Sequence, residues 1–104
     1  MSDPIKARRS RATEIRMASA IADGQLDVTT AGTPEALAGA ATPCRGVLIR
    51  AKATNTDVVY VGDATPIFPL AASEAINLDI DDLSKVYVDA VVTGEGVVWL
   101  IESN

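Results

Sequence analysis

The sequence predicts an all-β protein, a small antiparallel β-sandwich or jelly-roll-like barrel of about seven short strands, preceded by an N-terminal arm. Three observations support this fold class. From Gln25 onward, apolar and polar residues alternate with a period of two. The alternating segments are rich in β-branched residues and are separated by turn-like stretches. Their spacing of about 8–12 residues is typical of sandwiches and barrels. A chain of 104 residues corresponds to one domain.

The expected strands follow one another with short separators. In chain order they are "LDVTT", "EALA", "GVLIRAKA", "DVVYVG", "AINLDI", "KVYVDAVV" and "GVVWLIE". The separators are "AGT", "ATPCR", "TNT", "DATP", "DDLS" and "TGEG", all rich in residues that favour turns. The "EALA" segment can also be interpreted as a helical turn. In "AINLDI" the apolar side chains Ile76, Leu78 and Ile80 share one face, which indicates a half-buried strand.

The last two expected strands are apolar on both faces. Val97, Trp99 and Ile101 alternate with Val98 and Leu100, and Tyr87 points away from the core-facing residues of its strand. One face of each strand can line the core, so the other packs on something else. We therefore predict an oligomer interface that contains Tyr87, Val98 and Leu100. A flap formed by the N-terminal segment is the alternative.

Charge divides the chain into a basic arm, residues 1–24, and an acidic sandwich domain, residues 25–104. The arm holds five basic and three acidic side chains, a net charge of +2, whereas the rest holds four basic and eleven acidic side chains, a net charge of −7. Asp3, Pro4 and Gly24 would suit the start and stop of a helix, but the apolar stripe between them is weak. We expect an arm that orders only against a partner. A solvated chain end is the simpler interpretation.

Composition excludes several kinds of chemistry. The chain has no histidine and a single cysteine, Cys44, so it lacks a Ser-His-Asp or Cys-His arrangement and an internal disulfide. We predict no catalytic residue, no cofactor and no metal site, and hence no enzyme. No apolar run approaches the roughly 20 residues of a membrane span, and no signal-peptide segment follows the basic N-terminus. The expectation is a soluble protein that is not exported by that route.

The acidic cluster in "NLDIDDLSKVYVDA" is interpreted as a turn. Asp79, Asp81 and Asp82 lie between two alternating strands, and Asp side chains close turns by accepting backbone N–H bonds. A calcium loop would need six to eight oxygen ligands and the EF-hand spacing, which is absent. An adventitious cation and a catalytic carboxylate pair are the alternatives. "TGEG" is predicted to be a hairpin turn, Cys44 a structural thiol, and Trp99 a core residue or, alternatively, a platform for a sugar ring.

Several strings in residues 43–102 resemble the small β-sandwich virion proteins of tailed bacteriophages. They are "PCRGVLIRA" at 43–51, "NTDVVYVGD" at 55–63, "FPL" at 68–70 and "LDIDDLSKVYV" at 78–88. The preceding "VTTAGTPEALA" resembles the first hairpin of such proteins. These are turn and core patterns rather than catalytic motifs. The arm sequence "RRSRATEIR" has no counterpart in the resemblance.

The resemblance implies a capsid decoration, or cement, protein that is often trimeric. It would lie on the capsid exterior in the virion, and in the host cytoplasm before assembly. Its partners would be the major capsid protein and further copies of itself in a homotrimer. No nucleic acid and no membrane are expected as partners. Basic residues of the arm would form the capsid contact, because guanidinium groups pair bidentately with carboxylates: Arg8, Arg9, Arg11 and Arg16. A tail, baseplate or head-fibre-base module, and a carbohydrate-binding module that uses Trp99, are the rival interpretations.

Overall fold

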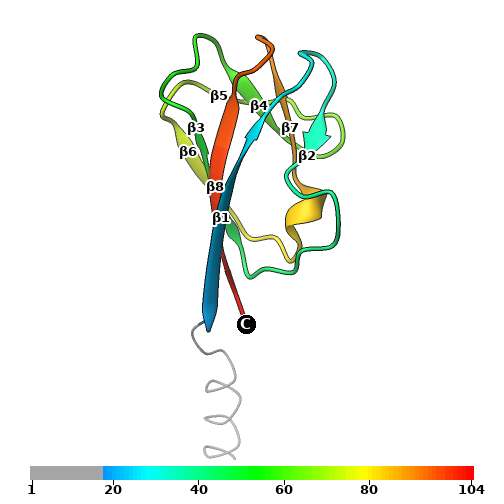
Figure 1. Cartoon of the computed structure of the whole chain (residues 1–104), viewed down its shortest axis with the longest axis vertical. Helices are drawn as coiled ribbons and strands as arrows, with labels where there is room; N and C mark the ends of the chain where they lie inside the picture. The colour runs from blue at the N-terminus through cyan, green and yellow to red at the C-terminus, as the bar shows by residue number, and fades with distance from the viewer. Residues whose placement is uncertain (1–17) are drawn as a thin grey trace, which may run out of the picture.

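The computed structural model describes residues 18–104, which form a sandwich of two four-stranded antiparallel sheets (Figure 1). The all-β prediction is confirmed, with eight strands instead of about seven and with open sheets instead of a closed barrel. The strands are β1 (Ala20–Asp27), β2 (Glu35–Ala36), β3 (Val47–Ala51), β4 (Val59–Gly62), β5 (Phe68–Leu70), β6 (Ala75–Leu78), β7 (Tyr87–Ala90) and β8 (Gly96–Ser103). A short 3₁₀ helix, η1 (Leu83–Lys85), precedes β7.

The strand order is that of a jelly roll. One sheet has the order β1-β8-β3-β6 and the other β2-β7-β4-β5. The pairs are nested: β1 with β8, β2 with β7, β3 with β6, and β4 with β5. Only the β4–β5 connection is therefore a hairpin within one sheet. The prediction of a hairpin turn at "TGEG" is wrong, because the strands on either side of it belong to different sheets. Strand β8 pairs with β1 and β3, whereas β7 pairs with β2 and β4.

The turn at "TGEG" instead carries the chain from one sheet to the other. Gly94 adopts a φ of 90°, a conformation that glycine tolerates best, and its N–H donates to the Val28 carbonyl at 2.8 Å. The expected first hairpin, "VTTAGTPEALA", is also a crossing, since β1 and β2 belong to different sheets. Its "EALA" segment supplies the two-residue strand β2, not a helical turn.

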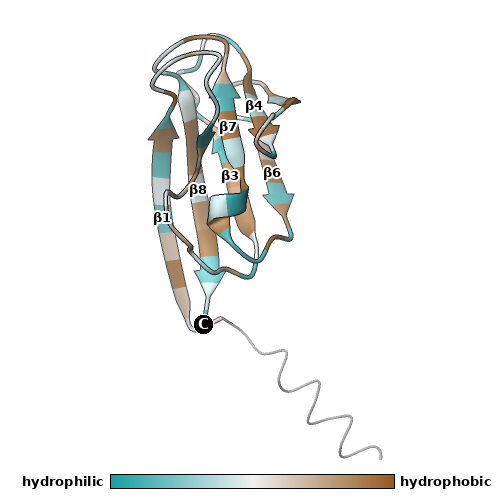
Figure 2. Ribbon diagram, turned by 90° about the vertical axis from the view of Figure 1, so that its right-hand side faces the viewer, coloured by the Kyte–Doolittle hydropathy of each residue, from teal (hydrophilic) through white to brown (hydrophobic). Residues whose placement is uncertain are grey.

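The core lies between the sheets and consists almost entirely of aliphatic side chains. Burial alternates along β3 and β4, which places every second residue inside, as the period-two pattern predicts. The strands of both layers carry hydrophobic segments, drawn in brown in Figure 2. Leu83 of η1 closes the core and is fully buried. The buried apolar residues are Val28, Leu37, Cys44, Val47, Ile49, Ala51, Val59, Val61, Leu70, Leu83, Val86, Val88, Ala90, Val97 and Ile101.

Strand β1 begins earlier than the expected boundary between arm and sandwich. It starts at Ala20, opposite Ser103, and continues through Gly24, opposite Trp99. Residues 20–24 therefore belong to the sandwich, and Gly24 is a strand residue and not a helix stop. β1 and β8 lie side by side along their whole length and reach the same end of the molecule (Figure 1). No helix in residues 18–104 is long and apolar enough to cross a membrane.

Candidate functional surfaces

The acidic cluster is a structural turn, as predicted. One oxygen of Asp82 caps η1 by accepting the backbone N–H groups of Thr42 and Ser84, both at 2.9 Å, and the Ser84 hydroxyl at 2.7 Å. The bond from Thr42, followed by those from Ser84, stabilises the charged form and lowers the pKa of Asp82 below its ordinary value. Asp81 forms an ion pair with Lys85 at 2.7 Å. The Asp82 carboxylate therefore fastens residue 42 to the turn before β7.

The Glu95 carboxylate likewise holds a loop in place, at the opposite end of the sandwich. Its carboxylate accepts the Thr56 hydroxyl at 2.7 Å, the Thr56 N–H at 2.6 Å and the Asp57 N–H at 3.2 Å. These bonds, the one from the Thr56 side chain first, lower the pKa of Glu95. Within residues 18–104, no group of three or more His, Cys, Asp or Glu side chains could hold a metal ion.

Cys44 and Trp99 both face the inside of the sandwich. Cys44 is buried, and its thiol donates to the Ile80 carbonyl at 3.3 Å. Trp99 lies on the same face of β8 as Val97 and Ile101, and a Cβ placed on Gly24 would lie 2.5 Å from its ring. Its indole N–H is buried without an acceptor among the described residues. Because the ring packs on Gly24, this arrangement favours the core interpretation of Trp99 over a sugar platform.

The three residues predicted to form one interface are divided between two faces. Val98 and Leu100 point outward from the sheet β1-β8-β3-β6 and are 39% and 40% exposed. Tyr87 alternates with the buried Val88 and so points outward from the other sheet. The three residues therefore do not share one face of a single chain, because consecutive strands β7 and β8 belong to opposite layers. Whether either face binds a partner stays a prediction.

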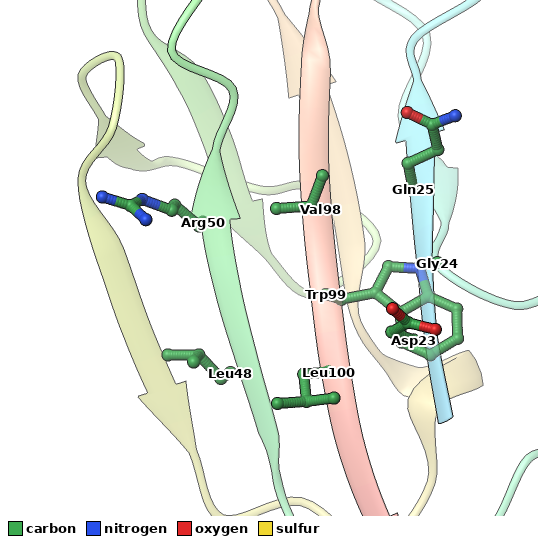
Figure 3. A pocket seen from close by; sticks show the side chains of 8 residues that line it. All are labelled: Asp23, Gly24, Gln25, Leu48, Arg50, Val98, Trp99 and Leu100. Atoms are coloured by element: carbon green, nitrogen blue, oxygen red, sulfur yellow. The ribbon is translucent and has the colours of Figure 1, made fainter. Parts of the chain in front are cut away.

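We use the term outer A face for the outward side of the sheet β1-β8-β3-β6. At its centre, Leu48 of β3 lies opposite Leu100 of β8, beside Val98. A shallow groove of about 540 Å³ runs over these side chains (Figure 3). Its remaining lining residues are Asp23, Gly24, Gln25, Arg50 and Trp99. A neighbouring groove of about 460 Å³ is also lined by Leu48 and Leu100, so the two hollows adjoin at these side chains.

Polar side chains border this apolar centre. The Lys52 ammonium bonds to Gln25 at 2.7 Å and to Asp27 at 2.6 Å. Arg50 donates through Nε to the Ser73 carbonyl at 3.1 Å, which leaves its two terminal amino groups without a partner in residues 18–104. The Asp23 carboxylate likewise has no hydrogen bond or ion pair with the residues that the structure describes. Beside the apolar centre, the terminal amino groups of Arg50 and the carboxylate of Asp23 thus lack a partner among residues 18–104. Three further charged residues, Arg45, Asp79 and Glu102, line the neighbouring groove.

Sequence reasoning found part of this face and missed the rest. Val98 and Leu100 were predicted to be outward, but Leu48, Arg50 and Asp23 were not singled out. The signal for two of them was present, because Leu48 and Arg50 alternate with buried Val47 and Ile49 in "GVLIRAKA". The predicted capsid-contact residues Arg8, Arg9, Arg11 and Arg16 lie outside the described residues.

Two smaller groups of apolar side chains are also exposed. Ile67 and Phe68, at the end of the β4–β5 hairpin, are 83% and 53% exposed, and Val91 and Val92 lie in the crossing before β8.

Comparison of the chain with protein-family models, with curated proteins and with solved structures finds no match.

Proposed function

We propose that this chain is a non-enzymatic structural protein of a tailed-phage virion. It decorates the outer capsid and bridges neighbouring subunits of the major capsid protein. The observation that carries the proposal is the jelly-roll strand order of the described residues, since that architecture recurs in viral capsid domains. This step is an analogy at the level of the fold. The resemblance of residues 43–102 to phage virion sandwiches points in the same direction.

The use of the polar side chains also supports a structural role. Asp82 and Glu95 hold turns together, and Asn55 is bonded to the backbone of Gly96. The thiol of Cys44 is buried against a carbonyl. Groups that elsewhere act as bases or nucleophiles thus serve the fold of residues 18–104. We therefore place the function of this chain in binding through its surface.

The basic segment is the part of the chain best suited to the capsid contact. Four arginines precede β1, which is an edge strand of the sheet β1-β8-β3-β6: Arg8, Arg9, Arg11 and Arg16. Guanidinium groups in such a segment pair with carboxylates on a neighbouring protein surface. Simultaneous engagement of several copies raises the effective concentration of each contact and resists separation of capsid subunits. DNA is a poorer partner, because a net charge of +2 attracts phosphates weakly and the acidic sandwich repels them.

The test is addition of purified protein to capsids that lack it. Replacing Arg8, Arg9, Arg11 and Arg16 together with Ser should abolish or sharply weaken sedimentation with the capsids. The matched control replaces the same four residues with Lys, which keeps the charge and loses the bidentate fork. We expect the Lys variant to retain part of the binding and to lose it as salt is raised. Equal binding by the Ser variant and the wild type would contradict the arm as the contact.

A cryo-EM map of the source particle locates the protein independently. The proposal expects density for the sandwich on the outer capsid shell. Density confined to the tail, the baseplate or the base of a head fibre would overturn it.

A further inference from the structure

The outer A face carries opposite charges at opposite corners of an apolar centre. In one row across the sheet, Asp23 of β1 lies beside Leu100 of β8, which lies beside Leu48 of β3. In the row two residues away, Gln25 lies beside Val98, which lies beside Arg50. Asp23 therefore occupies the β1 corner of the first row, and Arg50 the β3 corner of the second row.

The two charged corners are too far apart to pair within one chain. Two strand spacings across the sheet and two residues along it separate their Cα atoms by roughly 12 Å. No ion pair between them is present in the described structure, and in Figure 3 the Arg50 side chain points away from Asp23. Among residues 18–104 neither corner has an ion-pair partner. A partner that presents the opposite charge at the same distance from an apolar centre could therefore pair with each corner.

A second copy of the same face meets that requirement. A two-fold axis that lies in the plane between two facing sheets, and crosses the line from Asp23 to Arg50 at a right angle, exchanges the two corners. Asp23 of each copy then faces Arg50 of the other, and Val98, Leu100 and Leu48 of both copies meet in the middle. We propose that the outer A face is a two-fold interface through which two copies of this chain associate face to face.

The area of the outer A face places this association among small and weak interfaces. Four strands about 4.8 Å apart, with four to eight residues of about 3.4 Å each, offer on the order of 400–500 Å² per copy. The total of roughly 800–1,000 Å² lies at the low end for specific interfaces, where complexes are weak. We therefore expect a dissociation constant in the micromolar range. Physiological ionic strength favours the measurement, because it screens repulsion between the two acidic bodies more than contact between close pairs.

The test reverses each charged corner. Sedimentation equilibrium of the full chain should show a dimer for the wild type at about 100 µM, well above a micromolar dissociation constant. Asp23→Arg and Arg50→Asp each replace two attractive contacts with two repulsive ones. Each variant should raise the dissociation constant at least about tenfold. The neutral variants Asp23→Asn and Arg50→Gln should raise the dissociation constant by a smaller factor. They replace the charge reversals in the test if a reversal impairs folding.

Mixing the two reversed variants is the decisive measurement. In a mixed pair, Arg at position 23 of one copy faces Asp at position 50 of the other, and the native Arg50 and Asp23 complete the second contact. The mixture should therefore dimerise with a dissociation constant near that of the wild type, whereas each variant alone dimerises at least about tenfold more weakly. A ring of three cannot be rescued in this way, because an odd ring always keeps one contact between like variants. The mixture thus distinguishes the two-fold dimer from the trimer that the family resemblance implies.

Two apolar variants provide matched controls. Leu100→Ser, at the centre of the face, should weaken the dimer, whereas Ile67→Ser, exposed but outside the face, should leave it unchanged. A wild-type monomer at about 100 µM, a wild-type trimer, or reversed variants that dimerise normally would each overturn the proposal. The inference does not rest on the proposed function. Capsid binding and dimerisation are separate assays, so one can fail while the other succeeds.

Discussion

The side chain of Asn55 and the backbone of Gly96 are hydrogen-bonded in both directions. Asn55 Nδ2 donates to the Gly96 carbonyl at 2.9 Å, and the Gly96 N–H donates to Asn55 Oδ1 at 3.2 Å. Asn55 is the only buried polar or charged residue in the described part of the chain. The side-chain amide thus pairs with the Gly96 backbone at the first residue of β8, as a neighbouring strand would.

Replacing Asn55 should therefore destabilise the sandwich. Asn55→Ala leaves the buried Gly96 N–H without its partner and removes one of the two bonds that the Gly96 carbonyl accepts, the other coming from the Lys52 N–H at 3.0 Å. The lost bonds should cost about 1–3 kcal/mol of unfolding free energy. Urea unfolding monitored by the fluorescence of Trp99 measures the loss. Asn77→Ala, an exposed change on β6, should fall within about 0.5 kcal/mol of the wild type. If both variants unfold at the same urea concentration as the wild type, the Asn55 bonds contribute nothing net.

Gly96 should tolerate no side chain. A Cβ at this position would lie 1.8 Å from the Leu26 carbonyl oxygen, which belongs to the paired strand β1 and cannot move alone. Gly96→Ala should cost about 3 kcal/mol or more, because it forces β1 away from β8. Gly39→Ala meets no atom within 4 Å and serves as the control. A Gly96→Ala variant with native thermal stability would show that the two strands can separate without penalty.

The stability of the fold should fall at acid pH through two carboxylates. The pKa values of Asp82 and Glu95 are lowered in the folded chain from ordinary values of 3.8 and 4.5. The unfolded chain therefore takes up protons first. The contribution of both groups is fully present above these ordinary values and is lost as the pH falls through the lower folded ones.

Two amide variants check this dependence. Asp82→Asn and Glu95→Gln should be less stable than the wild type at pH 7, and their deficits should shrink as the pH falls below about 4. Asn77→Ala changes no titrating group, so its small deficit should stay constant. Deficits of Asp82→Asn and Glu95→Gln that remain equal at pH 7 and pH 3 would contradict the assigned roles.

Two truncations should separate the basic segment from the sandwich. Deleting residues 2–17 leaves all eight strands and the buried apolar core of residues 18–104 in place, so cooperative thermal unfolding should persist. Deleting residues 2–24 also removes the part of β1 that pairs with residues 99–103 and uncovers Trp99. We expect its melting temperature to fall by at least about 5 °C. An unfolded product of the shorter deletion would mean that the basic segment is part of the core.

The sequence predicted the faces of the strands better than their partners. Alternation placed Val97 and Ile101 inward and Val98 and Leu100 outward, because side-chain direction along a strand has a fixed period. The same pattern says nothing about which strand lies alongside. Tyr87 was therefore grouped with Val98 although β7 and β8 belong to different sheets.

Two other errors have local causes. Strand β5 was missed because it has only three residues and contains Pro69, which is tolerated on this edge strand. The start of β1 was missed because Gly24 suits a helix stop. In the structure its lack of a side chain makes room for the ring of Trp99, a contact between distant positions that no local pattern reveals.

The nested strand pairing has a consequence for how the chain reaches its native state. The β4–β5 hairpin joins neighbours, whereas β1 and β8 join positions 20 and 103. Folding dominated by such distant contacts is slow, because chain entropy is lost before the contacts form. During synthesis, β1 and β3 have no β8 between them until the last strand leaves the ribosome. Their apolar residues stay uncovered until then, which makes the nascent chain vulnerable to aggregation.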